Sequence, residues 1–132
     1  MKKIKIINIF LIFILNIACN NSNNIFMKDH NVIEYNTDDF KKFEKHSTIK
    51  LKEAWNIQKK YALEKNENPK NWLFFIIDGN YVFTSIFEPK LPAASTGGIW
   101  VNSETGEIKE INSDIMLRYK EAYNGDGKEF LF

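Results

Sequence analysis

The chain has 132 residues, which is room for one domain, and its 18 basic and 17 acidic residues leave a formal net charge of +1. This balance provides no basic surface for nucleic acid, so nucleic acid is excluded as a partner. A single cysteine excludes a disulfide framework and a cysteine-rich zinc site, and two histidines leave little for a metal centre. The composition therefore indicates no cofactor.

The N-terminal segment has the pattern of a secretory signal peptide. Three lysines precede an apolar stretch at residues 6–15, and the small Ala18 stands directly before the only cysteine, Cys19. The apolar stretch is shorter than the roughly 20 residues of a membrane span, and polar residues 20–24 follow it. We predict that residues 1–18 are removed, which leaves 15 basic against 17 acidic residues and a net charge of −2.

The only cysteine lies in a segment that resembles the lipobox of bacterial lipoproteins, Leu15-Asn16-Ile17-Ala18-Cys19. In that family the cysteine thiol receives a diacylglycerol, and cleavage makes the cysteine the new N-terminus. The resemblance therefore implies cleavage between Ala18 and Cys19 and a lipid on Cys19. The family usually has leucine three residues before the cysteine, where this chain has Asn16. The alternative is a plain signal peptide with an incidental cysteine.

Lipidation would place the protein in the cell envelope, facing the periplasm or the exterior. Two or more acyl chains, at about 0.8 kcal/mol per buried methylene, give a stable anchor where one chain does not. Asn20 rather than aspartate follows the cysteine, which in Gram-negative lipoproteins favours export to the outer membrane.

After the cysteine, residues 19–47 are predicted to be a tether and a poorly defined N-terminal segment. Within it, Val32–Tyr35 could add a short strand and Asp38–Lys45 one or two helical turns. The clearest helix is predicted over residues 49–65, where one mostly apolar face recurs at three- and four-residue intervals. That face consists of Leu51, Ala54, Trp55, Gln58, Tyr61 and Ala62.

Four strands are predicted next, at residues 71–78, 81–87, 99–102 and 107–111. The first is apolar on both alternating faces, which indicates a strand covered on two sides. Asp78-Gly79 indicates a tight hairpin turn, and residues 88–98 are predicted to be a loop.

A last helix is predicted to begin at Asn112 or Ser113 and to end at Gly125. Its apolar face would consist of Ile115, Met116, Tyr119, Ala122 and Tyr123. The predicted fold class is therefore α+β: an N-terminal helix packed on a curved antiparallel sheet of about four strands, with a C-terminal helix. Residues 48–132 would form this single small domain.

Part of this domain is similar to small bacterial domains of the cystatin-like and nuclear-transport-factor-like group, some of which are immunity proteins against secreted toxins. The similarity covers about residues 48–112. It rests on the helix with Ala54 and Trp55, on the strand pair around Trp72 and residues 81–83, and on the run from Gly97 to Ile108. The Gly-Gly, strand, Thr-Gly-Glu pattern in that run also occurs in small secreted peptidase-propeptide-type domains. The resemblance implies protein binding and carries over no catalytic residue.

No arrangement typical of catalysis stands out. His30 and His46 both precede the predicted core, and Gly97-Gly98 leads into a strand, whereas a phosphate cradle leads into a helix N-terminus. Acidic residues that could pair in a cleft stand at predicted turns instead: Asp78, Glu88, Glu104 and Glu107. We predict that the protein is not an enzyme.

Surface recognition is the function that this sequence favours. Tyr81, Phe87 and Trp100 are large residues of the predicted sheet and are candidate partner contacts, with burial in the core as the alternative. The loop at residues 88–98 is a further candidate contact. We predict a membrane-anchored, non-enzymatic binding lipoprotein, an immunity or inhibitor protein for a secreted toxin or enzyme. The alternatives are an envelope assembly accessory and a small-ligand binder that uses the concave side of the sheet.

Overall fold

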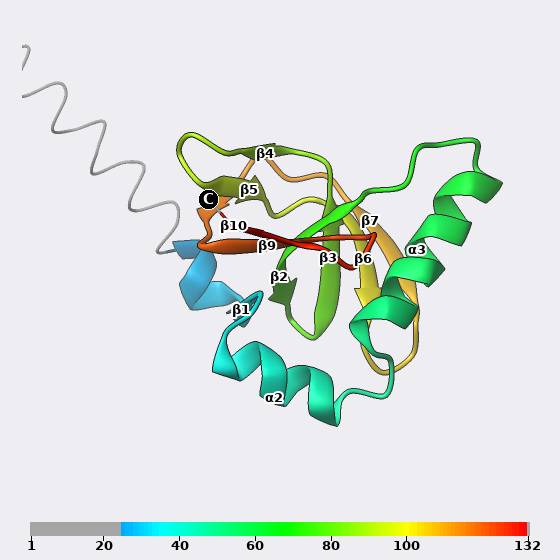
Figure 1. Cartoon of the computed structure of the whole chain (residues 1–132), viewed down its shortest axis with the longest axis horizontal. Coiled ribbons are helices and arrows are strands. Elements are labelled where there is room, and N and C mark those ends of the chain that lie inside the picture. The colour runs from blue at the N-terminus through cyan, green and yellow to red at the C-terminus, as the bar shows by residue number, and fades with distance from the viewer. Residues whose placement is uncertain (1–24, 132) are drawn as a thin grey trace, which may run out of the picture. The chain divides into compact units, whose positions relative to one another are not determined.

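A computed structural model describes residues 25–131 of the chain. Residues 25–29 form a short helix, which belongs to a first unit, Met1–His30, while Asn31–Phe132 form a second unit. The predictions on the signal peptide and the lipobox, with Ala18 and Cys19, lie outside the described residues. The second unit contains the sheet and both longer helices (Figure 1).

The helices of the second unit precede most of its strands. The order begins with β1 (Val32–Glu34), α2 (Asp38–His46) and α3 (Leu51–Glu64). The strands that follow are β2 (Trp72–Ile77), β3 (Asn80–Thr84), β4 (Phe87–Glu88), β5 (Ala93–Ser95), β6 (Gly98–Asn102), β7 (Ile108–Ile111), β8 (Met116–Arg118), β9 (Glu121–Asn124) and β10 (Glu129–Leu131).

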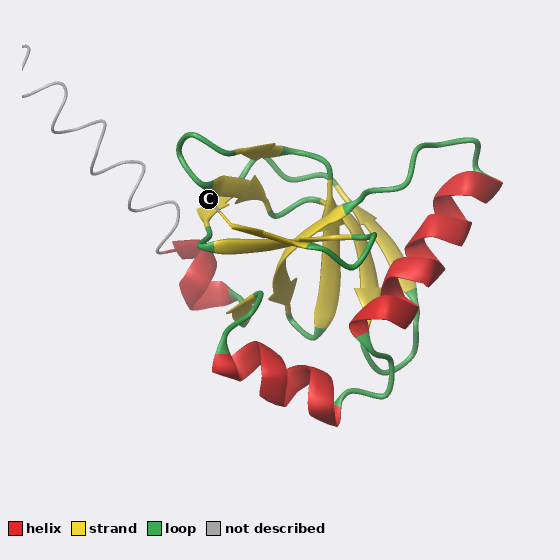
Figure 2. Ribbon diagram, viewed as in Figure 1, coloured by secondary structure: helices red, strands yellow, loops and turns green. Residues whose placement is uncertain are grey.

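Two antiparallel sheets organise these strands (Figure 2). The larger, seven-stranded sheet has the order β10-β9-β2-β3-β6-β7, with β1 paired to β2 beside β9. The smaller sheet has the order β4-β5-β8. The predicted α+β class is thus confirmed, and α3 packs across β3 and β6 of the larger sheet. The sheet has more strands than the four we predicted.

The four predicted strands are present as β2, β3, β6 and β7. Local turn chemistry explains why they were visible in the sequence. Asp78 and Gly79 both have positive φ, 50° and 77°, between the paired residues Ile77 and Asn80, which is the geometry of a tight hairpin turn. The five residues of β2 after Trp72 are all buried, which confirms that the strand is covered on two sides.

The C-terminal helix that we predicted is absent, and residues 113–125 instead contain β8 and β9. The reason is a pairing requirement distant in sequence. β1 covers only the Phe75–Ile77 part of the β2 edge, and β9 pairs with the remainder, Trp72 and Leu73. Buried backbone groups must be hydrogen-bonded, so the ladder with β2 outweighs the helical spacing of the apolar residues.

Two expectations about boundaries also change. The second unit begins at Asn31, earlier than the start at residue 48 that the sequence suggested, because β1 pairs with β2 and α2 packs beside it. The predicted loop at residues 88–98 contains the β5 strand, which pairs with both β4 and β8.

Reciprocal capping fixes the corner between α2 and α3. The Lys50 ammonium donates to the carbonyl oxygens of Glu44, Lys45 and Ser47 at 2.6, 3.0 and 2.9 Å, at the C-terminal end of α2. In return, the Glu44 carboxylate accepts a hydrogen bond from the Leu51 backbone N–H at 3.2 Å, at the start of α3. Each side chain satisfies backbone groups that a helix end leaves unpaired, with the charge that the helix dipole favours.

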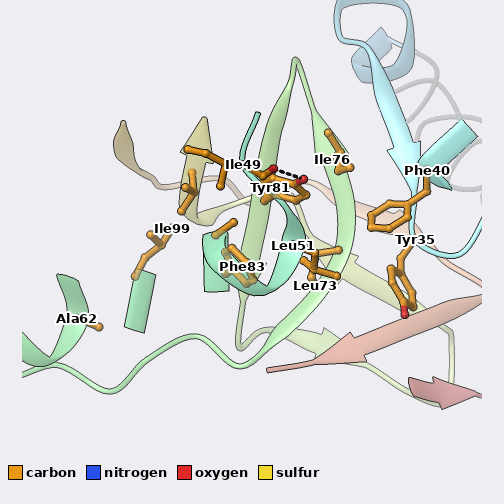
Figure 3. Close-up of a cluster of buried hydrophobic side chains, with 12 residues drawn as sticks. Tyr35, Phe40, Ile49, Leu51, Ala62, Leu73, Ile76, Tyr81, Phe83 and Ile99 are labelled. Carbon is orange, nitrogen blue, oxygen red and sulfur yellow. Dashed lines mark hydrogen bonds between the residues drawn. The ribbon is translucent and has the colours of Figure 1, made fainter. Parts of the chain in front are cut away.

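The main core lies between the helices and one face of the larger sheet (Figure 3). Tyr81 is fully buried there, and its hydroxyl donates to the Ile49 carbonyl oxygen at 2.7 Å. Burial raises the pKa of Tyr81 to about 12, so the hydroxyl stays protonated and keeps this bond at neutral pH. The core residues are Tyr35, Phe40, Ile49, Leu51, Ala54, Ala62, Leu73, Ile76, Tyr81, Phe83, Ile99 and Val101.

A second apolar layer forms where β2 meets the smaller sheet. The ring of Phe74 lies 4.2 Å from that of Tyr119 and 5.3 Å from that of Phe87, measured between centroids. Ala94 of β5 and Leu117 of β8, which pair in register with each other, are buried as well. These contacts give β2 its second apolar face.

Candidate functional site

The three predicted contact residues do not come together on one surface. Tyr81 belongs to the main core and is fully buried. Trp100 is 9% exposed, and its indole N–H donates to the Thr96 carbonyl oxygen at 3.1 Å. Phe87 is half-buried on β4. Tyr81 and Trp100 are therefore core residues, the alternative that the sequence allowed, and only Phe87 reaches the surface to a larger extent.

Phe87 is part of an aromatic rim, which we define as Trp72, Phe87 and Phe130. The Trp72 ring lies 5.1 Å from that of Phe87 and 5.2 Å from that of Phe130, and Phe130 is 36% exposed. The rim joins β2 and β4 with β10, which lies far from both in the sequence. Sequence reasoning missed Phe130 because its role depends on the pairing of β10 with β9. The apolar residues at the C-terminal end of the sequence were the one indication that Phe130 could contribute to a surface.

The connection from β3 to β5 carries two strongly exposed apolar side chains. Ile86 is 64% exposed and Leu91 is 63% exposed, and we call residues 85–92 the apolar loop. Its backbone is held in place: Ile86 N–H donates to Thr84 Oγ1 at 3.1 Å, and the Ile86 carbonyl accepts from Ser95 N–H at 2.9 Å. Apolar side chains exposed on a fixed loop beside an aromatic rim are typical of a contact surface for another protein.

A polar groove with a volume of about 260 Å³ adjoins the apolar loop, since Ser85 and Ile86 line it. A set of hydroxyl groups forms its floor. Ser95 Oγ accepts from Gly97 N–H at 3.0 Å and donates to the Ser113 carbonyl at 3.3 Å. Together with Ile86 of the apolar loop, polar and charged residues line the groove, among them Lys70, Thr84, Ser85, Ser95, Glu110 and Asn112.

Gly97 and Gly98 line the wall of this groove. Both positions require glycine, because backbone atoms of neighbouring segments leave no space for a Cβ atom. A Cβ atom on Gly97 would lie 2.8 Å from the Ile111 carbonyl oxygen, and one on Gly98 would overlap the carbonyl oxygen of Phe83. The two glycines lead from β5 into β6, as we predicted, and they form no phosphate cradle at a helix N-terminus.

The histidines and acidic residues do not assemble a catalytic arrangement in the described part of the chain. His46 is exposed in a groove of about 460 Å³ with Asp39, Lys42 and Glu104. The Glu104 carboxylate accepts from the Thr48 hydroxyl at 2.6 Å, and the Asp78 carboxylate accepts from Asn31 N–H at 2.9 Å. Both acids lie in turns, as the sequence suggested, but their carboxylates bond to groups that are distant in the sequence.

His30 lies in the first unit, where its ring stacks on that of Phe26 at 4.3 Å. Across residues 25–131, no group of three histidine, cysteine or acidic side chains is placed to hold a metal ion. Nor does any helix among these residues have the length and apolar character to cross a membrane.

The chain was compared with family models, with characterised proteins and with solved structures. No protein-family model, no curated protein and no solved structure matches it.

Proposed function

We propose that this chain is a lipid-anchored protein of the cell envelope that binds a protein partner and performs no catalysis. The partner that we propose is a secreted toxin or enzyme, which would make the chain an immunity or inhibitor protein of the cystatin-like kind. The observation that carries the proposal is the N-terminal segment, where a basic start and an apolar stretch lead to a single cysteine. A protein anchored there meets secreted proteins at the surface that it protects.

The apolar loop and the aromatic rim support the second half of the proposal. Enzymes position titratable groups in a cleft, whereas the strongest surface feature here is apolar: Ile86 and Leu91 on the loop, with Phe87 between them in sequence and Trp72 beside it. Aromatic and large aliphatic side chains of this kind provide most of the binding energy at protein interfaces. The apolar loop overlaps, at residues 88–92, with the loop at residues 88–98 that the sequence suggested as a contact.

The anchor is tested by replacing Cys19 with serine. We expect the wild-type protein to incorporate labelled palmitate and to enter the detergent phase in Triton X-114 partitioning, because two or more acyl chains bind detergent strongly. Cys19→Ser should lose both properties, whereas Asn20→Ser, the neighbouring polar substitution, should keep them. If Cys19→Ser stays in the detergent phase, the lipid anchor is refuted.

The contact surface is tested with two matched leucines. Leu91 on the apolar loop and Leu63 on α3 are 63% and 55% exposed, so replacing either by serine should leave the thermal midpoint of unfolding nearly unchanged. We expect Leu91→Ser combined with Ile86→Ser to abolish co-purification of the partner from cross-linked envelopes. Leu63→Ser should retain it.

The same variants separate the proposed partner from its alternative. An immunity protein should protect cells from one toxin, and the loop variant should lose that protection while its membrane localisation is unchanged. An assembly accessory would instead show an envelope defect without any toxin. Equal loss of the partner in Leu63→Ser would exclude the apolar loop as the contact surface.

A further inference from the structure

The polar groove contains one lysine whose charge is not matched within it. Lys70 is half-buried, stands two residues before the start of β2, and lines the groove together with Glu110. The Glu110 carboxylate is already paired, since it accepts from the Lys65 ammonium at 3.1 Å. The described residues provide no ion pair for the Lys70 ammonium. Within the described residues, Lys70 is thus the charged lining residue without an ion-pair partner, and a bound anion would pair with its ammonium.

A buried glutamine fixes the backbone of this lysine. Gln58 lies on the inner face of α3, is 0% exposed, and accepts a hydrogen bond from Lys70 N–H through Oε1 at 3.1 Å. Its Nε2 is buried and has no hydrogen-bond partner. A buried amide that is only half satisfied destabilises a core, where methionine or leucine of similar size would stabilise it. The advantage of glutamine over methionine or leucine at this position is therefore its hydrogen bond to the Lys70 N–H.

The floor of the groove is rigid and its rim is rich in hydrogen-bonding groups. Thr84 and Ser95 are buried, and their hydroxyl groups bond to backbone groups of the surrounding strands and loops. Ser85 and Asn112, in contrast, are exposed at the edge of the groove. Polar side chains around one cation on a fixed floor are suited to a ligand that carries both a negative charge and hydroxyl groups.

We propose that the polar groove binds a small hydroxylated anion, no larger than one sugar ring, and that Lys70 holds its anionic group. The size follows from the volume of about 260 Å³, which is below the roughly 300–1,000 Å³ of sites for drug-sized ligands. The anionic group is a carboxylate or a phosphate, both of which accept hydrogen bonds from an ammonium. Ser85 and Asn112 contact the hydroxyl groups of the ligand. This site adjoins the apolar loop, since Ser85 and Ile86 belong to both, and anion binding does not require a protein partner.

The test is isothermal titration of the full mature chain with glucuronate, glucose 6-phosphate and glucose. We expect at least one of the two anions to bind at millimolar or lower concentration and neutral glucose to bind at least about tenfold more weakly. Binding of glucuronate alone identifies a carboxylate ligand, and binding of glucose 6-phosphate alone identifies a phosphate. If neither anion binds, or if glucose binds equally well, the proposal is overturned.

Two variants assign the binding to the groove. Lys70→Met should weaken the anion by at least about tenfold, whereas Lys60→Met, on the outer face of α3, should leave it unchanged. Gln58→Met should also weaken binding, because the Lys70 N–H loses its acceptor, and the unsatisfied N–H should lower the thermal midpoint. Full affinity in Lys70→Met or in Gln58→Met would contradict the proposal.

Discussion

Replacing Gly98 by alanine is expected to destabilise the protein by at least about 3 kcal/mol, or to prevent folding altogether. Gly98 has a φ of +133°, a conformation that L side chains rarely adopt, and its new Cβ would overlap the Phe83 carbonyl oxygen. This carbonyl belongs to β3, the central neighbour of β6, so the strand pair cannot separate without loss of the sheet. The measurement is urea denaturation followed by far-UV circular dichroism.

Gly79→Ala provides the matched control for this prediction. Gly79 also has a positive φ, +77°, but its Cβ would meet only the Ser103 hydroxyl at 4.0 Å, an ordinary contact. Its cost should therefore be that of the backbone conformation alone, about 1–2 kcal/mol. Equal losses for the two variants would show that conformation decides both cases and that the approach of β6 to β3 does not.

The strands that could be predicted are those whose ends are marked by turn residues next to them in the sequence. Asp78-Gly79 and Gly97-Gly98 mark a hairpin turn and a strand entrance, and alternation marks the strands between them. Among the C-terminal strands, β9 depends on the open edge of β2, about 50 residues earlier in the chain, and β8 depends on β5. The spacing of Ile115, Met116 and Tyr119 satisfies a helix equally well, and no local feature of the sequence distinguishes the two structures.

The candidate sites show the same division between local and distant information. The predicted contact loop at residues 88–98, one continuous segment, shares residues 88–92 with the apolar loop, whereas Ile86 was expected in a strand. Tyr81 was proposed as a contact on its size alone, but its register on β3 turns it toward the helices and into the core. The polar groove was not predicted, because Lys70, Ser85, Ser95 and Asn112 come from four separate segments. Only the fold brings these four residues together.

Trp55 and Gly125 are expected to show the strongest coupling in the molecule. The indole of Trp55, half-buried on α3, occupies the position that a Cβ on Gly125 would take. Gly125→Ala should therefore cost about 2–4 kcal/mol in the wild-type chain, because the indole must move out of the packed layer. Trp55→Ala should cost about 2–4 kcal/mol through lost packing, somewhat less than the 3–5 kcal/mol of a fully buried aromatic residue.

A double-mutant cycle separates this coupling from a general loss of stability. With Trp55→Ala in place, the space beside Gly125 is open, and Gly125 does not have a positive φ. Adding Gly125→Ala should then be neutral or stabilise the protein by up to about 1 kcal/mol, because alanine lowers the entropy of the unfolded chain. The sign of the Gly125→Ala effect is thus expected to reverse between the two backgrounds, as measured by chemical denaturation.

Gly127→Ala is the control for the cycle. Gly127 lies in the same turn between β9 and β10 and has a φ of +84°, but its Cβ would meet only the Tyr123 hydroxyl at 3.8 Å. Its cost should be the same with and without Trp55, since it comes from backbone conformation. If Gly125→Ala also costs the same in both backgrounds, then α3 does not pack its tryptophan against this turn. The close contact of α3 with the β9–β10 turn would then have to be abandoned, and with it the account of why Gly125 is a glycine.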